Sequence, residues 1–336
     1  MLKVLLSNTK IHLEIKEEIM INQILFLGQD HGYSALKDSS NHCFTSSVLE
    51  GKKLAVASED TVEVKIGEKY YTITNQGKKL SGINKVREEI DREIIKVLTL
   101  ASIYKSSFDH VDNVICNLCI GLPIQYYNQQ CEPFEEYIKQ ACDNQIVSVN
   151  GGKDKLINIT NITAIPQAAG MPFLYEDEFT DIPNSVVIDF GYYTIDVSFY
   201  SFMNLEDFYA SMPTGTKDIF GKLSRRLNEE YNININEKDM EKILQKGYIK
   251  DMDGDVHDLS VLDPLKDNYI YDIIASLKAE YRQLGQADKI FIIGGGAISF
   301  KEQIKKYIKN DVVFVENPRF ANANSFFKVA QLSFKE

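Results

Sequence analysis

Two short segments each place a carboxylate beside a glycine turn, a combination that can bind a phosphate together with a metal ion. They are Asp30–Lys37 and Asp189–Asp196, and each follows an apolar strand. Gly32 and Gly191 allow backbone N–H groups to converge on an anion. An aspartate at the mouth of such a turn suits Mg²⁺, which prefers oxygen ligands and keeps several of its waters. One such turn alone is more simply an ordinary hairpin, whereas two of them could hold a polyphosphate from both sides of a cleft.

Three further features suit the same ligand. Lys37 and Thr194, one in each segment, offer an ammonium and a hydroxyl to phosphate oxygens. The run Gly294–Ala297 lies between an apolar strand and a helix, where glycines let a flat base and a ribose pack on the backbone. Gln167, in the segment Pro166–Gly170 that we expect to open a helix, could orient an attacking water. Each feature alone also fits a flexible turn or a surface position.

The elements that position these residues follow from the pattern of apolar residues. Ile24–Lys37 and Val186–Tyr200 each read as two strands joined by a small acidic turn, which predicts two β-hairpins and suggests two similarly folded halves. Apolar periodicity predicts strands at 69–74, 111–120, 155–164, 289–293 and 312–315, and helices at 84–104, 133–142, 217–231, 237–246, 264–284, 301–309 and from about 322. Strands that alternate with helices over this length indicate an α/β architecture.

Composition restricts the class of protein. The chain has 336 residues, enough for two domains, with 44% hydrophobic and 25% charged residues, as in soluble globular proteins. The net charge of −11 disfavours direct binding to nucleic acid. Residues 1–20 do not read as a signal peptide, and no apolar run is long enough to span a bilayer. The five cysteines form no recognisable disulfide framework, so we expect a cytoplasmic protein.

Two other patterns have simpler explanations than a metal site. Cys116 and Cys119 are spaced like half of a zinc site, but side chains alternate along a strand, so we expect the two sulfurs on opposite faces. The segment Asp251–Asp255 hints at a calcium loop, but its glycine is misplaced and Leu262 stands where a bidentate glutamate is needed. We interpret the first as core cysteines and the second as a solvated turn.

The order of the motifs along the chain resembles that of the actin-like ATPases, and most closely their plasmid-segregation branch, the ParM/StbA family. The segments that carry the resemblance are Gln29–Lys37, Gly121–Pro123, Pro166–Gly170, Asp189–Asp196, Gly294–Ala297 and Phe320–Asn324. The resemblance implies an actin-like α/β fold, with two ribonuclease-H-like domains around a nucleotide cleft. Domain I would span 20–184, with a C-terminal helix at 322–336 returning to it, and domain II would span 185–321. Residues 1–19 have no counterpart in that family, and Met20 offers an alternative start site.

The resemblance also implies roles for individual residues. Asp30 and Asp189 would face Mg²⁺ through water. Residues of the first hairpin would hold the β-phosphate, and residues of the second the γ-phosphate. The nucleotide-binding residues would be Asp30, Gly32, Tyr33, Ser34, Lys37, Asp189, Gly191, Tyr192, Thr194, Gly215, Gly294, Gly295, Gly296 and Ala297.

The hydrolytic water would be positioned by Gln167 and Asp196. The chain departs from the family at Tyr192 and Tyr193, where small residues are usual. Because a bulky residue does not adopt positive φ cheaply, we expect the phosphate grip or the rate of hydrolysis to differ at this turn.

By the same resemblance, the chain would be a filament-forming protein of plasmid segregation. It would bind ATP or GTP with Mg²⁺, assemble with copies of itself, and contact DNA through an adaptor of the ParR type, touching neither nucleic acid nor a membrane directly. The alternative is a small-molecule kinase of the same fold superfamily. Gln167 at the water position and the lack of a substrate-domain insertion favour hydrolysis instead. A third reading, a cell-shape scaffold with a membrane-binding helix, is disfavoured by the acidity of residues 11–20.

Overall fold

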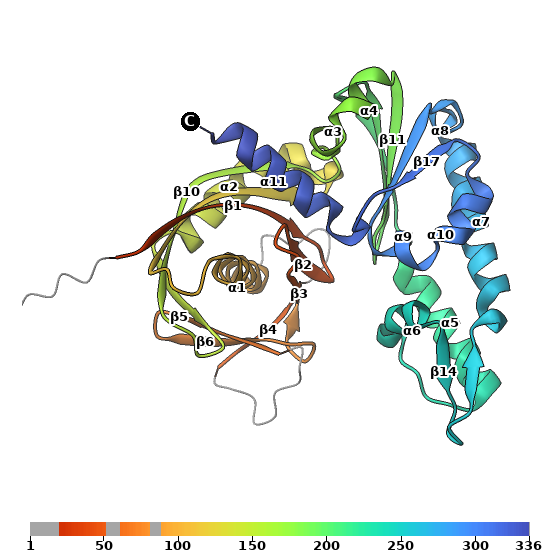
Figure 1. Cartoon of the computed structure of the whole chain (residues 1–336), viewed down its shortest axis with the longest axis horizontal. Coiled ribbons are helices and arrows are strands. Elements are labelled where there is room, and N and C mark those ends of the chain that lie inside the picture. Colours follow the sequence, from red (N-terminus) through yellow and green to blue (C-terminus); the bar gives the residue numbers. More distant parts are fainter. Residues whose placement is uncertain (1–19, 52–60, 81–88, 336) are drawn as a thin grey trace, which may run out of the picture.

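The computed structural model describes residues 20–51, 61–80 and 89–335, and the expected N-terminal extension at 1–19 lies outside these ranges. The chain forms two domains, each built around its own β-sheet (Figure 1). One sheet has ten strands and the other has five. The described chain begins with strands alone, up to residue 79, and helices and strands are interspersed after that. The expected α/β architecture with two domains is therefore confirmed.

The first sheet curves around a central helix (Figure 1). Its strands are β1 (Asn22–His31), β2 (Ala35–Asp38), β3 (Cys43–Thr45), β4 (Ser47–Glu50), β5 (Val62–Ile66), β6 (Lys69–Ile73), β7 (Lys78–Lys79), β8 (Asn113–Leu122), β9 (Gln145–Val149) and β10 (Lys155–Pro166). They lie in the order β3-β2-β1-β8-β10-β9-β5-β6-β4-β7. The central helix is α1 (Glu89–Ser106), whose Val97 and Leu98 are buried. Helix α2 (Tyr127–Cys142) contributes to the same core.

The second sheet carries helices on both faces. Its strands are β11 (Asn184–Phe190), β12 (Ile195–Ser201), β13 (Asn204–Met212), β16 (Lys289–Ile293) and β17 (Asp311–Phe314), in the order β13-β12-β11-β16-β17. The helices of one face are α5 (Thr216–Tyr231), α7 (Asp263–Glu280) and α10 (Lys301–Tyr307), and those of the other are α3 (Met171–Leu174) and α4 (Glu176–Asp181). Because side chains alternate along a strand, Val186 and Ile188 face the first group while Val187 faces the second.

Smaller elements complete the second domain. They are α6 (Met240–Lys246), the hairpin of β14 (Tyr248–Lys250) and β15 (Val256–Asp258), α8 (Arg282–Gln286) and α9 (Gly295–Ser299). The segment Asp251–Asp255 forms the turn between β14 and β15, where a carboxylate oxygen of Asp251 accepts hydrogen bonds from two backbone N–H groups of the turn. The expectation of a turn at this segment is confirmed.

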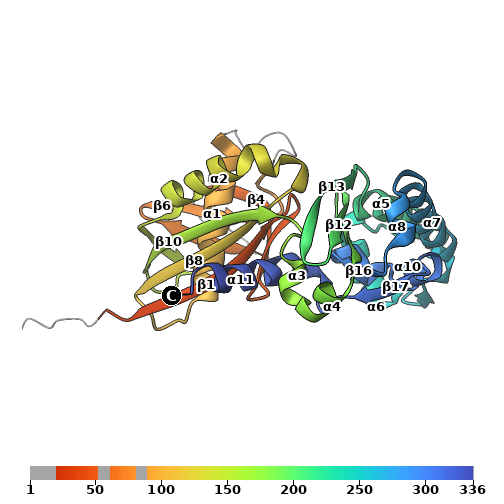
Figure 2. The ribbon, with the colours of Figure 1, turned by 90° about the horizontal axis from the view of Figure 1, so that it is seen from above.

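Two segments connect the domains (Figure 2). The first leads from the end of β10 to α3. The second leaves β17 through the short turn η4 (Pro318–Phe320) and enters α11 (Ala321–Ser333), which lies across β1 and β8. Gly28 permits this close approach, because a Cβ there would lie 2.0 Å from the carbonyl oxygen of Ala323. Helix α11, although last in the chain, is therefore seated on the first sheet.

Several sequence-based limits differ from the structure. Helix α2 begins at Tyr127, with Pro133 inside it, so the predicted start at 133 was wrong. The segment Pro166–Gly170 does not open a helix: Ala168 has a φ of 67°, and α3 begins only at Met171. The single helix predicted at 264–284 is two helices, α7 and α8, and residues 84–88 of another lie outside the described ranges.

The strand predictions included both hairpins and all the strands that pair in parallel, and they missed most of the others. Both hairpins form as expected, with β1 paired to β2 and β11 to β12. Strands β3, β4, β5, β7, β9, β13, β14 and β15 were missed. Strand β13, at one edge of its sheet, was missed, whereas β17, at the other edge, was predicted. The expected domain limits stay a prediction; α3 and α4 lie before residue 184 and pack on the second sheet.

The two cysteines of the zinc-like spacing lie on opposite faces of β8, as expected. Cys116 belongs to the core around α1, and Cys119 to the cluster beneath α11. In the part of the chain that the structure describes, no helix is both long enough and apolar enough to cross a membrane.

Candidate functional site

A cavity of about 170 Å³ lies between the two domains. It sits at the C-terminal ends of parallel strands, β1, β8 and β10 in the first sheet and β11 and β16 in the second. Open α/β sheets bind ligands at this edge, because there the connecting loops can turn toward a common space. The fold therefore brings together loops that are far apart in the sequence.

Most of the residues expected at a nucleotide site line this cavity. They are Asp30, Gly32, Tyr33, Ser34, Lys37, Gln167, Asp189, Gly191, Tyr192, Thr194, Asp196, Gly294 and Gly295. Three expected residues do not line it. Gly215 packs against the backbone of Tyr192, whereas Gly296 and Ala297 lie behind the cavity, Gly296 against Phe190 and Ala297 buried.

The first hairpin contributes an ion pair. Asp30 and Lys37 lie opposite each other in the β1–β2 register, and their Oδ2 and Nζ atoms are 3.1 Å apart. The side chain of Gln167, from the end of β10, donates a hydrogen bond of 2.9 Å to the other oxygen of Asp30. Burial lowers the pKa of Lys37, but Asp30 and Asp189 outweigh it and the net shift is upward. Lys37 is therefore held as an ammonium between carboxylates from both domains.

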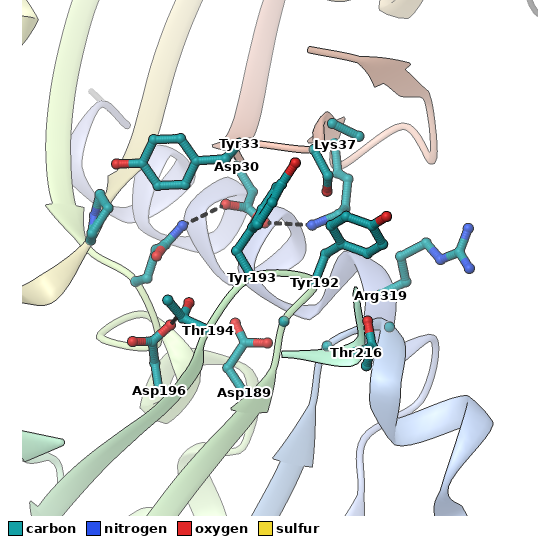
Figure 3. A pocket seen from close by; sticks show the side chains of 18 of the residues that line it. Asp30, Tyr33, Lys37, Asp189, Tyr192, Tyr193, Thr194, Asp196, Thr216 and Arg319 are labelled. Atoms are coloured by element: carbon teal, nitrogen blue, oxygen red, sulfur yellow. Dashed lines mark hydrogen bonds and ion pairs between the residues drawn. The ribbon is translucent and has the colours of Figure 1, made fainter. Parts of the chain in front are cut away.

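The second hairpin contributes two carboxylates. Asp189 and Asp196 pair in the β11–β12 register, and the hydroxyl of Thr194 donates to Asp196 at 2.8 Å. Burial raises the pKa of Asp189 to about 7; Lys37 opposes this shift, and the Asp196 and Asp30 carboxylates add to it. Burial also raises the pKa of Asp196, against hydrogen bonds from Ser211 and Thr194. Figure 3 shows these groups facing the first hairpin across the cavity.

The donor set suits a divalent cation bound together with an anionic ligand. Three aspartates, Asp30, Asp189 and Asp196, and one lysine, Lys37, line the cavity beside the Arg319–Glu241 ion pair, so with all groups ionised the carboxylates outnumber the cations. Carboxylate oxygens and retained waters are what Mg²⁺ prefers. Within the described ranges no three His, Cys, Asp or Glu side chains converge closely enough to hold a metal by themselves.

The glycine run after β16 lies against the second carboxylate. Gly294 has a φ of +86°, and a Cβ there would lie 2.3 Å from Oδ1 of Asp189. A side chain at this position would be strained and would also displace the carboxylate. The requirement for glycine therefore comes both from the backbone and from the site.

The two tyrosines of the second hairpin adopt ordinary backbone angles. Neither Tyr192 nor Tyr193 is among the described residues with positive φ, so the strain expected at this turn is absent. Their rings meet edge to face at 4.9 Å, and both line the cavity (Figure 3). The ammonium of Lys217 lies 5.1 Å from the centre of the Tyr193 ring. The two tyrosine rings thus form part of the cavity wall, while the backbone that carries them keeps negative φ.

Several lining residues were not among those assigned to the site from the sequence, although Ala35, Pro123 and Tyr193 lie in or beside motifs that the sequence did show. The unassigned lining residues are Ala35, Cys43, Pro123, Tyr193, Ser211, Thr216, Phe220, Glu241 and Arg319. Arg319, in η4, forms an ion pair with Glu241, in α6. Arg319 directly precedes the segment Phe320–Asn324 that carried part of the resemblance, which was a usable signal; Glu241 lies in a charged helix and had none.

Two sequence families match the chain. A model described as "Actin like proteins N terminal domain" matches residues 28–170, and one described as "Archaeal actin homologue MreB-like, C-terminal" matches residues 187–306. The two matches follow each other and together cover most of the chain. A comparison with curated proteins found no match.

Solved structures of similar fold span nearly the whole chain. The archaeal actin homologue Ta0583 has a TM-score of 0.74 and 18% identity, over 94% of this chain and 100% of its own. Bacillus thuringiensis ParM with AMPPNP has a TM-score of 0.71 and 14% identity, over 92% and 99%. A ParM of a 15-stranded filament from Clostridium botulinum has a TM-score of 0.68 and 19% identity, over 93% and 99%. The likeness is one of fold, and it confirms the expected fold class.

Proposed function

The chain belongs to the actin-like protein family, and on that premise we propose that it is a nucleotide-dependent filament protein that hydrolyses ATP or GTP with Mg²⁺ and drives plasmid segregation. The observation that carries the proposal is the pair of acidic hairpins. Asp30 and Lys37 face Asp189 and Asp196 across one cavity, with Gln167 hydrogen-bonded to Asp30. A polyphosphate with its metal is a ligand whose charges this arrangement complements.

In this proposal the residues divide the work between the two domains. Asp30 and Asp189 would hold Mg²⁺, which when bound would supply positive charge against the phosphates. Lys37 and the turn Gly32–Ser34 hold one phosphate, while Gly191 and Thr194 hold the next. Gln167 orients the attacking water from the side of Asp30.

Filament formation and its cellular role rest on the family and on relatives. Two of the solved structures of similar fold are a 15-stranded ParM filament and a ParM with AMPPNP. We propose that this chain also self-associates head to tail, since an open heterologous contact between identical subunits grows a filament. With a net charge of −11, contact with DNA is assigned to a more basic adaptor of the ParR type, in the cytoplasm.

The test uses the full chain with ATP or GTP and Mg²⁺. We expect phosphate release without any acceptor, together with a rise in pelletable mass and light scattering that depends on nucleotide. Asp189→Ala is expected to lose metal-dependent nucleotide binding, and removal of Mg²⁺ should do the same to the wild type. Strict dependence of turnover on an acceptor would indicate a kinase, and failure to pellet with either nucleotide would contradict the filament proposal.

A further inference from the structure

The side-chain amide of Asn322 joins three parts of the molecule just behind the candidate site. Asn322 lies in the first turn of α11 and is 5% exposed. Its Nδ2 donates a hydrogen bond of 2.9 Å to Oδ2 of Asp189. Its Oδ1 accepts one of 3.1 Å from the backbone N–H of Ala168. Asn322 does not itself line the cavity.

These contacts link the two domains. Helix α11 is seated on the first sheet, where Ala323 touches Gly28 of β1 and Phe326 is fully buried. Asp189 lies near the end of β11 in the second sheet. Helix α11 thus packs on the first sheet, although Ala321 at its start belongs to the core of the second, and Nδ2 of Asn322 donates to a carboxylate of the second domain.

The other contact holds an unfavourable backbone conformation. Ala168 has a φ of 67°, which is uncommon for a residue with a Cβ and is maintained only by its surroundings. Its N–H is held by Asn322, and its carbonyl oxygen accepts a hydrogen bond of 2.7 Å from the hydroxyl of Tyr200. The preceding residue is Gln167, whose side chain reaches Asp30. The conformation of Ala168 therefore sets the direction from which Gln167 enters the site.

The chemistry at this position requires an amide. The carboxylate of Asp189 needs a donor, the N–H of Ala168 needs an acceptor, and an asparagine supplies both from one planar group. An aspartate would keep the contact to Ala168 but would turn an oxygen toward Asp189. An aliphatic residue would leave both partners without a hydrogen bond, in a buried place.

We propose that Asn322 is a positioning residue for the reaction. It holds Asp189 directly and Gln167 through Ala168, and so fixes the positions of these two side chains relative to each other. This inference rests on the proposed function, because it assigns Asp189 to the metal and Gln167 to the water. It identifies Asn322, which lies outside the cavity, as the residue through which the position of α11 affects both Asp189 and Gln167.

Two substitutions separate the two contacts. Asn322→Leu removes both, whereas Asn322→Asp keeps an acceptor for Ala168 and loses the donor to Asp189. The matched control is Val329→Ala, which loosens the packing of the same helix at a residue 8% exposed and far along α11 from the amide. All three are made in the full chain.

Two measurements distinguish positioning from a merely structural role. The first is the Mg²⁺ concentration that gives half-maximal nucleotide hydrolysis, which we expect to rise about 10–100-fold in both Asn322 variants and not in the control. The second is hydrogen–deuterium exchange of the Ala168 amide in the nucleotide-free protein. It should become faster in Asn322→Leu but stay protected in Asn322→Asp.

The outcomes are separable from those of the proposed function. If the wild type neither binds nor hydrolyses nucleotide, the proposed function fails and the role of Asn322 in the reaction fails with it, and the exchange of the Ala168 amide then reports only on its contact with Asn322. If Asn322→Leu does not fold, Asn322→Asp supplies the metal dependence. An unchanged Mg²⁺ dependence in Asn322→Asp, or an unchanged amide exchange in Asn322→Leu, would overturn the assignment.

Discussion

Lys37 pairs with Asp30 and feels the charge of Asp189 across the cavity, and Asp196 lines the same cavity beside Asp189, so the candidate site has more carboxylates than ammonium groups. Burial disfavours charge, and the pKa of Asp189 is raised because its burial and its carboxylate neighbours outweigh the effect of Lys37. A divalent cation would supply the missing positive charge. The folded protein is therefore expected to be less stable without the cation than with it. The stability of the cation-free protein should also depend on pH.

The pH dependence has opposite signs for folding and for ligand binding. Asp189 has a pKa of about 7 in the folded chain against an ordinary value of 3.8, so between these limits the folded state keeps a proton that the unfolded state has lost. The free energy of unfolding contributed by Asp189 therefore falls as pH rises from about 4 to about 7. Since Mg²⁺ binds the ionised carboxylate, metal-dependent nucleotide binding should strengthen over the upper part of the same window.

Asp189→Asn provides the check. Denaturant unfolding of the apo protein should show that the variant gains stability relative to the wild type between pH 5 and pH 8. A constant difference across this range would contradict the assignment of the raised pKa to Asp189. Titration of nucleotide with Mg²⁺ at the same pH values measures the binding side in the wild type.

Gln167→Ala should separate turnover from assembly. The side chain of Gln167 holds Asp30 and points into the cavity, but it contributes no charge to the nucleotide. Loss of an oriented water should slow phosphate release by about 10²-fold. Sedimentation with nucleotide should still show assembly, and the filaments should persist longer because hydrolysis is slower. Normal phosphate release in the variant would exclude this role for Gln167.

At the scale of elements, the packing of helix α11 on strand β1 requires that position 28 carry no side chain. In Gly28→Ala the new Cβ would meet the carbonyl oxygen of Ala323 and the backbone nitrogen of Phe327. Backbone cannot rotate away as a side chain can, so α11 must shift. We expect a loss of about 1–3 kcal/mol or more, measured by denaturant unfolding.

The control for this substitution is Gly285→Ala. Gly285 lies in α8, and a Cβ there would meet no atom within 4 Å. The variant should be as stable as the wild type or slightly more so, since alanine favours a helix. Equal losses of stability in Gly28→Ala and Gly285→Ala would show that the close approach of α11 to Gly28 does not determine the effect.

At the scale of the whole molecule, a ligand in the cavity should stabilise both domains together. The lining comes from β1, β2 and the end of β10 in one domain and from β11, β12 and the end of β16 in the other. Binding to the folded state alone adds about 2.7 kcal/mol to stability when the ligand is present at 100 times its Kd. Thermal unfolding with Mg²⁺ and nucleotide should therefore shift to higher temperature.

This shift should occur as one transition rather than two. If only one of the two domains bound the ligand, only that domain would be stabilised. Melting curves recorded with one probe in each domain would then differ after nucleotide is added. Asp189→Ala should abolish the shift without lowering the melting temperature of the apo protein by a comparable amount, because it removes a buried charge.

The sequence by itself determined the two hairpins and the glycine turn after β16. These features are local. Asp30 faces Lys37, and Asp189 faces Asp196, within single hairpins whose strands and turn are contiguous. The alternation of apolar residues and the need for glycine at a tight turn are set by neighbours in the chain. The order of such local signals was also sufficient to indicate the fold.

Only the tertiary structure decided which distant residues meet at the site. Gln167 reaches Asp30 across 137 positions, and Asn322 reaches Asp189 and Ala168 across 133 and 154. Arg319 and Glu241 meet in the same way. A single polar residue has no periodicity that could reveal its partner. Its contacts depend on how α11 and the two connecting segments pack between the sheets, and that packing is a property of the whole chain.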